Sequence, residues 1–328
     1  MARFLIKRLL LATLTLFAVS VLSFLMFFGL PADPVSGMCP KNCNAERLER
    51  VRQELGLRDP LVEQYANYMK GIVAGRDLGS SQGGHCDAPC LGYSYVNGEA
   101  VTDTLRRVLP VTLSVVIPAA FLWLCLGVGL GMVSALRRGT LLDRLAIGFS
   151  LTGASLQIYF VGAILLLVFV YNLAILPNPH YTSILEDPLD WAAGLVLAWF
   201  ALAFLFSAIY ARISRAQMLE TLSEDFVRTA RAKGLPKTRV YGRHALRAAL
   251  TPIVTIAGLD VGGALGGTVI TETTFGIQGL GRTAVYAVRQ GDLPTIMATV
   301  LISAVFIVVA NIVVDFLYAV VDPRVRLQ

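Results

Sequence analysis

Six stretches of this chain are strongly apolar, and each is long enough to cross the roughly 30 Å hydrocarbon core of a bilayer as a helix. They are Leu9–Leu30, Val108–Leu136, Leu145–Ile175, Trp191–Ala211, Ala248–Thr271 and Leu293–Val321. Charged residues make up 15% of the 328 residues, against about 25% in an ordinary soluble domain. The sequence therefore predicts an all-α integral membrane protein with six transmembrane helices.

The positions of basic residues predict the orientation, because short cytoplasmic loops are enriched in Lys and Arg. Basic residues lie in Met1–Arg8, in Arg137–Arg144, after Ala211 and at the C-terminus, whereas Asn172–Asp190 has none. We therefore expect both termini in the cytoplasm and a Gly-rich external loop over Glu272–Asp292. A signal peptide is the alternative for the first stretch, but its apolar core would be shorter.

The chain is predicted to have three parts. Residues 1–30 form the first transmembrane helix, residues 31–107 an external lobe, and residues 108–328 a five-helix core with a cytoplasmic segment over 221–247. The lobe is polar and contains the helix-like stretch Leu61–Val73. Its basic residues do not oppose an external location, because loops longer than about 60 residues are exempt from the charge rule.

Four cysteines in the lobe form two CxxxC motifs, Cys39 with Cys43 and Cys86 with Cys90. In an oxidising external compartment such cysteines predict two disulfides. A tetrahedral zinc site with His85 as a further ligand is the alternative. Four cysteines allow three pairings, and we favour bonds between the motifs, because these close the longer loop and constrain the unfolded chain most. In each case the expected role is structural.

The longest polar run in the second half of the chain is Thr221–Pro252, which is strongly basic. Ser223 is a plausible N-cap, and two acidic residues follow it, where they suit the helix dipole. A small-residue stripe over Phe226, Ala230 and Gly234 predicts one narrow helix face. Gly234, Leu235 and Pro236 then end the helix, and a second helix leads into the next apolar stretch. The candidate residues of this segment for binding a cytoplasmic partner are Glu224, Asp225, Phe226, Arg228, Ala230, Arg231, Lys233 and Gly234.

Glycines at short spacing predict close helix packing in two apolar stretches. Gly127, Gly129 and Gly131 lie in the second, and Gly258, Gly262, Gly263, Gly266 and Gly267 lie in the fifth. The fifth also contains Asp260, and a carboxylate inside a span usually faces a partner or a water-filled cavity. Dense packing and a pathway-lining helix are both compatible with this pattern. The candidates for a pathway or gate are Asp260, Gly263, Gly267 and Glu272.

Catalytic patterns are missing from the sequence. No phosphate-binding G-x-x-x-x-G-K-[ST] motif occurs, and His85, His180 and His244 fall in three separate segments. We therefore expect a chain that is not an enzyme and holds no metal or other cofactor of its own. A proton-coupled secondary transporter would show inverted repeats and paired ionisable residues within the membrane, and we find no such repeat and no such pair. A receptor, or a loop that only binds lipid, is a further alternative.

Several motifs resemble the permease subunits of ABC importers, most closely the B-type subunit of the dipeptide and oligopeptide family. They are Leu55–Pro60, Gly75–Ser80, Glu224–Gly234, Arg243–Arg247, Thr251-Pro252, Glu272–Arg282, Asn311–Asp315 and Asp322–Arg324. The resemblance covers nearly the whole chain. The sequence departs from the family pattern at Ser155–Tyr159, at Ile277-Gln278 and at Asp260, and the CxxxC motifs are not a general family feature.

The resemblance implies a type I ABC importer permease fold in a bacterial cytoplasmic membrane. It also implies a second homologous permease, two cytoplasmic ATPase subunits or domains that bind ATP and Mg²⁺, and an external substrate-binding protein. The helix ending at Gly234 would then lie in a groove of an ATPase and couple ATP binding to the spans. Peptides are the expected cargo, and nickel chelates, glutathione and oligosaccharides are the alternatives.

Overall fold

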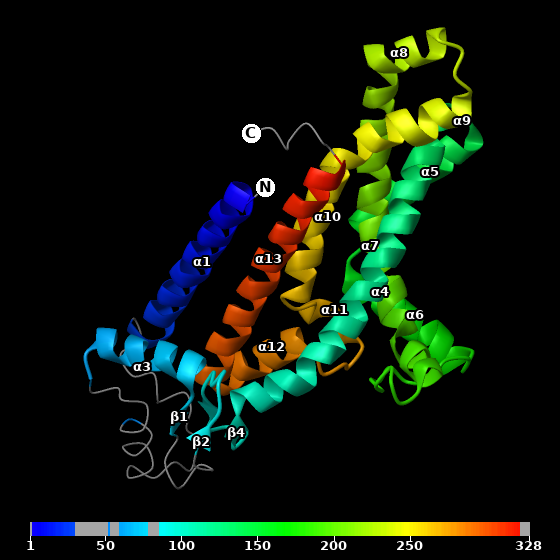
Figure 1. Ribbon diagram of the computed structural model, residues 1–328. Coiled ribbons are helices and arrows are strands. Elements are labelled where there is room, and N and C mark those ends of the chain that lie inside the picture. The colour runs from blue at the N-terminus through cyan, green and yellow to red at the C-terminus, as the bar shows by residue number, and fades with distance from the viewer. Residues whose placement is uncertain (1, 30–51, 53–58, 78–84, 322–328) are drawn as a thin grey trace. The chain divides into compact units, whose positions relative to one another are not determined.

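The computed structural model describes residues 2–29, 52, 59–77 and 85–321 (Figure 1). These residues fall into two compact units. The first comprises Met1–Thr112, Gly266–Val269 and Gln278–Val308, and the second comprises Leu113–Leu265, Ile270–Ile277 and Val309–Gln328. Two long helices, α4 (Val101–Leu136) and α13 (Leu293–Val321), contribute to both units. Cys39 and Cys43 lie outside the described residues.

The first unit begins with α1 (Ala2–Phe24), which continues as the π-helical turn η1 (Leu25–Gly29). Its second helix, α3 (Leu61–Ala74), confirms the helix predicted in the lobe. Aromatic packing joins the two, because the ring of Phe24 lies 5.3 Å from that of Tyr65 and 6.2 Å from that of Tyr68, centroid to centroid. Phe24, Tyr68 and Met297 form the buried centre of this contact.

Two short hairpins follow α3. In the first, β1 (Arg76–Asp77) pairs antiparallel with β2 (His85–Cys86), and in the second, β3 (Tyr93–Ser94) pairs with β4 (Glu99–Ala100). The second hairpin is bonded to the start of α13, because Asp292 Oδ2 accepts hydrogen bonds from the hydroxyls of Ser94 at 2.6 Å and Thr295 at 2.7 Å. The second hairpin is therefore fixed to a helix of the same unit.

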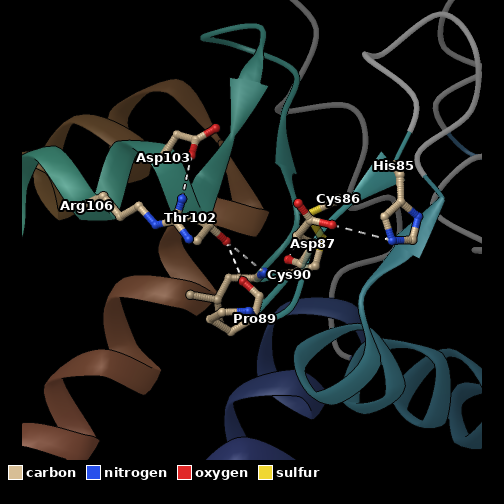
Figure 2. Close-up of a disulfide and its surroundings, with 9 residues drawn as sticks. His85, Cys86, Asp87, Pro89, Cys90, Thr102, Asp103 and Arg106 are labelled. Atoms are coloured by element: carbon tan, nitrogen blue, oxygen red, sulfur yellow. Dashed lines mark hydrogen bonds and ion pairs between the residues drawn. A yellow bond between two sulfur atoms is a disulfide. The ribbon is translucent and has the colours of Figure 1, made fainter.

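A disulfide joins Cys86 to Cys90 (Figure 2). The favoured bonds between the two CxxxC motifs are therefore wrong for these two cysteines. The chain turns directly after β2, which brings the two Cα atoms to 5.7 Å, within the usual range for a disulfide. The turn is tied to α4, because the hydroxyl of Thr102 donates to the carbonyl of Pro89 at 2.6 Å. The same pairing leaves neither sulfur as a thiolate ligand for zinc.

The segment predicted as a Gly-rich external loop, Glu272–Asp292, is mostly helical, and its external location stays a prediction. It contains part of α11 (Val269–Thr274) and all of α12 (Leu280–Gln290). Gly276 and Gly291 end these helices with positive φ values of 70° and 67°, a conformation that glycine adopts without steric cost. The glycines therefore mark helix ends. Leu280 and Ala287 of α12 are buried, and Leu280 packs with Val101 and Leu105 of α4 in the first unit.

The second unit is built around α7 (Pro188–Ser223), which packs against α5 (Leu141–Ser155), α6 (Ile158–Leu165) and α10 (Leu246–Leu265). The close approach of neighbouring helices to α7 depends on glycines, as predicted. A Cβ atom on Gly127, Gly131 or Gly153 would lie 2.4–2.6 Å from atoms of α7. Gly129 is the exception, because it faces away from α7 and no described atom lies within 4 Å of its Cβ position.

The third apolar stretch is not one straight helix. It bends by 102° between α5 and the following pair, α6 with the π-helical η2 (Leu166–Asn172). The break is local, because Leu156 and Gln157 both have extended backbone, with ψ values of 141° and 148°. The described residues therefore include five helices long and apolar enough to span a membrane, and six when the bent pair is counted as one span.

His180, in the loop before α7, pairs with Asp190 in the first turn of α7. Nδ1 of His180 lies 2.8 Å from the carbonyl oxygen of Asn178, and Nε2 lies 2.9 Å from Asp190 Oδ2. Because both neighbours are acceptors, the doubly protonated imidazolium satisfies both. The Asn178 carbonyl, followed by the Asp190 carboxylate, therefore raises the pKa of His180 above its usual value.

We expect His180→Gln to lose more thermal stability at pH 5.5 than at pH 9. A raised folded-state pKa stabilises the protein below the unfolded pKa of about 6.5, and this contribution disappears as pH rises through the folded pKa. The midpoint of unfolding in detergent at both pH values measures the effect, with exposed His244→Gln as the control. A loss that is equal at both pH values would exclude the charged pair.

Candidate functional site

The polar segment between α7 and α10 forms a helical corner at one end of these long helices (Figure 1). After α7 ends at Ser223, the chain forms α8 (Asp225–Ala232), a turn, the short α9 (Lys237–Arg239) and the π-helical η3 (Val240–Ala245), which continues into α10. The predicted short helix and the second helix that leads into the next span are both confirmed. We call Ser223–Ala245 the α8 corner.

The inward face of α8 carries Val227 and Ala230, which are 0% and 8% exposed. They lie in a buried cluster of small and medium apolar residues from four other segments: Ala135, Met218, Val240, Ala245 and Ala249. The expected single helix face of Phe226, Ala230 and Gly234 is therefore wrong, because Ala230 is buried whereas Phe226 and Gly234 are exposed. The i, i+3 spacing of Val227 and Ala230 places the two side chains on the same side of the helix. The sequence did not predict this buried face, because Val227 is a single valine among charged residues.

The outward face of α8 carries most of the predicted partner-binding residues. Phe226 is 45% exposed, although it is a large aromatic residue. The other exposed candidates are Glu224, Asp225, Arg228, Arg231, Lys233 and Gly234. Asp225 and Arg228 form a solvent-exposed ion pair at 3.5 Å. The surface therefore combines one aromatic side chain with charges of both signs, and cations outnumber anions near the C-terminal end of the helix.

The N-terminus of α8 differs from the prediction. Ser223 does not cap it, because the Ser223 hydroxyl donates to the carbonyl of Glu220 at 2.7 Å in the last turn of α7. Glu224 is in the N-cap position with extended backbone and makes no side-chain capping bond. Asp225 lies in the first turn, where its charge suits the helix dipole.

The C-terminus of α8 ends at Gly234, as predicted. Gly234 has φ +73°, and its amide donates to the carbonyl of Arg231 at 3.0 Å, while the amide of Leu235 donates to the carbonyl of Ala230 at 3.4 Å. These two bonds define a Schellman motif, in which glycine is favoured because the left-handed conformation strains other residues. Leu235 completes it by packing against the buried cluster.

We expect Gly234→Asn to retain the stability of the α8 corner and Gly234→Ala to weaken it. No described atom lies within 4 Å of the Cβ position, so neither side chain clashes within the chain. Alanine in this conformation costs about 1–2 kcal/mol, whereas asparagine tolerates it. Thermal unfolding of both variants measures the difference. Equal loss of stability in both variants would show that the left-handed backbone at this position is not what favours glycine.

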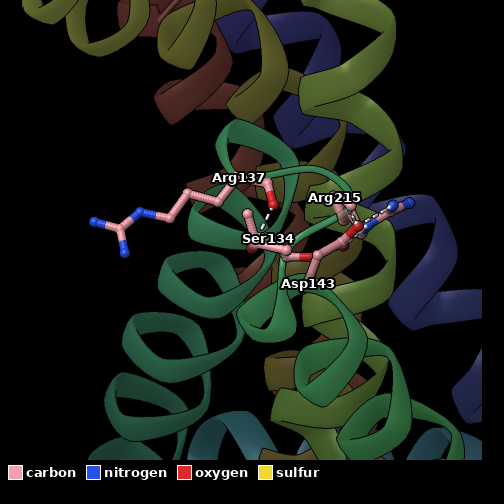
Figure 3. Close-up of polar contacts among 6 residues, drawn as sticks. Ser134, Arg137, Asp143 and Arg215 are labelled. Atoms are coloured by element: carbon pink, nitrogen blue, oxygen red, sulfur yellow. Dashed lines mark hydrogen bonds and ion pairs between the residues drawn. The ribbon is translucent and has the colours of Figure 1, made fainter.

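A buried polar network fixes the start of α5 to α7 near the same end of the unit (Figure 3). Asp143 is 4% exposed and accepts from Arg215 Nε at 2.8 Å, from Arg215 Nη2 at 3.1 Å, from the Ser134 hydroxyl at 2.6 Å and from the Gly139 amide at 2.9 Å. Four bonds to one carboxylate join α4, the α4–α5 turn, α5 and α7. The sequence indicated only a basic loop here, because the two partners are 72 residues apart.

The four pathway candidates lie in different local environments. Asp260 on α10 accepts a hydrogen bond from the buried Tyr210 of α7 at 2.7 Å, so a neutral donor satisfies it in part. Gly263 is exposed, and Glu272 is fully buried in α11. Gly267, in the first unit, has φ +132°, and its Cβ position lies 2.9 Å from Gly281 Cα. Their proposed role in a pathway remains a prediction.

The fold matches a known class of transporter membrane subunit. It is similar to a chain of the inward-facing MetNI methionine ABC transporter, with a TM-score of 0.54 and 18% identity over 67% of this chain and 97% of that chain. At this identity the likeness concerns the fold alone. The chain therefore has the type I permease fold of ABC importers, as its motifs predicted.

Sequence comparison defines the family. Residues 1–116 match the N-terminal region of binding-protein-dependent transport system membrane components, and residues 127–327 match the inner membrane component of these systems. The chain belongs to this family of multi-pass inner membrane proteins. It is 33% identical to the dipeptide transport system permease protein of Escherichia coli K12 over 350 residues, and 32% identical to a peptide transport system permease protein of Brucella abortus over 326 residues. Each alignment covers 99% of both chains.

Proposed function

We propose that this chain is a permease subunit through which an ATP-driven importer moves di- or oligopeptides into the cell. The choice of peptides as cargo rests on the full-length similarity to permeases named for peptide and dipeptide transport. Both termini and the α8 corner lie in the cytoplasm, and the hairpins of the first unit lie outside. The chain catalyses no reaction itself.

Its proposed partners are a second homologous permease, two cytoplasmic ATPase subunits or domains, and an external substrate-binding protein. ATP and Mg²⁺ bind to the ATPases. The outward face of α8 supplies the contact with one ATPase, because a half-exposed aromatic side chain beside arginines is the kind of group that anchors protein interfaces. The charged residues around Phe226 orient the partner and exclude wrong ones.

The inward face of α8 explains how movement of an ATPase would reach the spans. Val227 packs with Met218 of α7 and with Val240, Ala245 and Ala249 on the way into α10. Interiors of this kind are close-packed and transmit displacement. A force on α8 therefore acts on two membrane-spanning helices together. Asp143 extends the same connection from α7 to α5 through its bonds to Arg215.

We expect Phe226→Ala to reduce ATP-driven peptide uptake at least about tenfold, in the range of an interface anchor, without lowering thermal stability. Uptake is measured with labelled di- and oligopeptides in proteoliposomes that contain all partner subunits, together with retention of the ATPase on the purified permease. Tyr286→Ala is the matched control, because Tyr286 is 50% exposed and lies on α12, far along the chain from α8.

Unchanged uptake and ATPase retention in Phe226→Ala would contradict the coupling role of this face. Uptake that follows a proton gradient without ATP would overturn the importer mechanism itself. Competition by a nickel chelate, glutathione or an oligosaccharide, with no competition by peptides, would replace the cargo and leave the coupling argument in place.

A further inference from the structure

A small cavity in the first unit is lined by polar side chains within an otherwise apolar wall. It measures about 40 Å³ and is bordered by Gln64 and Tyr68 of α3, by Arg76 of β1, and by Phe24, Phe28, Leu91, Gly92, Pro294 and Met297. A single water molecule needs roughly 10–15 Å³ of such volume. The cavity, called the α3 cavity below, therefore has room for a ligand of a few non-hydrogen atoms.

Three polar atoms of its lining residues have no partner among the residues that the structure describes. They are Arg76 Nε, the hydroxyl of Tyr68 and Gln64 Oε1, and all three atoms are buried. Tyr68 is 7% and Gln64 9% exposed. The amide nitrogen of Gln64 holds the side chain in place, because Nε2 donates to the carbonyl of Asp59 at 2.8 Å. Buried polar groups are normally hydrogen-bonded, so these atoms indicate a missing ligand.

Arg76 brings a positive charge to this cavity. Burial lowers its pKa, and among the side chains that the structure describes the ionisable groups that act on it are Tyr95 and Tyr68, neither of which is a carboxylate. Glycines make room for its side chain on two sides. Arg76 Cδ lies 3.1 Å from the Cβ position of Gly71, and Arg76 Nη2 lies 3.3 Å from that of Gly92. The backbone is thus shaped around a guanidinium for which the described side chains supply no counter-charge.

We propose that the α3 cavity binds a small monovalent anion, either a carboxylate group or chloride. Arg76 supplies the charge and an N–H donor, and the Tyr68 hydroxyl supplies a second donor. Gln64 Oε1 is an acceptor, and a water molecule beside the anion satisfies it. Water alone would satisfy the neutral atoms but would leave the guanidinium without the counter-charge that the described side chains do not provide. A bound anion would join α1, α3, β1 and the start of α13 within the first unit.

The test uses the full-length chain purified in detergent with its partner subunits. The midpoint of thermal unfolding is measured against increasing sodium chloride or sodium acetate, with sodium gluconate added to keep the ionic strength constant. Gluconate is too large for a cavity of this size. A ligand that binds the folded state raises the midpoint in a saturable way. Saturation by acetate without chloride identifies the carboxylate, and the converse result identifies the halide.

We expect Arg76→Gln to raise the half-saturating anion concentration at least about tenfold, because it removes the charged partner of a buried anion. Tyr68→Phe keeps the ring and removes the hydroxyl, so it should weaken binding while leaving the fold intact, and it serves if Arg76→Gln does not fold. Arg106→Gln is the matched control, because the side chain of Arg106 is 69% exposed in the same unit.

A midpoint that does not respond to either anion in the wild-type protein would overturn the proposal. So would an anion response that is identical in the wild type and in both cavity variants, since the stabilisation would then arise elsewhere. The measurement reports stability and not transport. Its failure would therefore leave the proposed permease function untouched.

Discussion

Replacing Gly131 with leucine is expected to prevent α4 from packing on α7, whereas the same substitution at Gly129 leaves the packing intact. A Cβ atom on Gly131 would lie 2.5 Å from the carbonyl oxygen of Ala211 and 2.6 Å from Ser214 Cβ. Neither contact can be relieved by rotating a side chain, because one involves backbone and the other a Cβ atom. The helices would have to separate, and membrane helices associate largely through such close packing.

Gly129 is the matched control, because it lies on the same helix and no described atom is within 4 Å of its Cβ position. A leucine there faces an apolar surround, where it is favourable. Size-exclusion profiles and thermal unfolding of the two variants in detergent measure the contrast, and uptake in proteoliposomes follows it. Equal stability of the two leucine variants would show that this helix contact does not hold the unit together.

Removing the carboxylate of Asp143 is expected to lower the midpoint of thermal unfolding by several degrees and to abolish uptake. Asp143→Ala would leave Arg215 facing Ser134 without its counter-charge, and an uncompensated charge that is mostly buried is strongly destabilising. The α4–α5 turn would also lose its bond from the Gly139 amide. Unfolding curves and uptake assays measure the two effects.

The double variant Asp143→Asn with Arg215→Gln should be more stable than Asp143→Ala, because replacing both charges removes the unpaired one. Asp103→Ala is the control, since its ion pair with Arg106 spans 3.6 Å at the surface, with side-chain exposures of 60% and 69%. Exposed pairs of this kind contribute little to stability. A double variant no better than the single one would show that the carboxylate acts through Ser134 and Gly139 alone.

Hydropathy and charge were enough to predict the membrane spans, because a bilayer leaves few choices to an apolar stretch of that length. They did not predict the 102° bend after Ser155. The break falls at Leu156 and Gln157, and neither position has a proline or glycine that would have predicted it. The Gly-rich region around α12 was predicted as a loop, although Gly276 and Gly291 occupy the turns at the helix ends.

The α8 corner could be predicted in outline and not in orientation. The glycine at position 234 and the proline at 236 specify where the helix ends, since they act through the local backbone. Which face turns inward depends on partners such as Met218 and Ala249, which belong to other helices. The network of Asp143 and Arg215 and the pairing of Cys86 with Cys90 likewise depend on three-dimensional proximity, which spacing along the chain does not reveal.

The anchoring of α8 bears on how such subunits evolve. Val227 and Ala230 fill the space beneath the helix, so selection for folding acts on them and leaves Phe226 and Arg228 free. These two residues can then change together with the protein they meet, at little cost to the fold of the permease. Gene duplication followed by drift on this one surface would be sufficient to give paralogous transport systems in one cell different partner specificities.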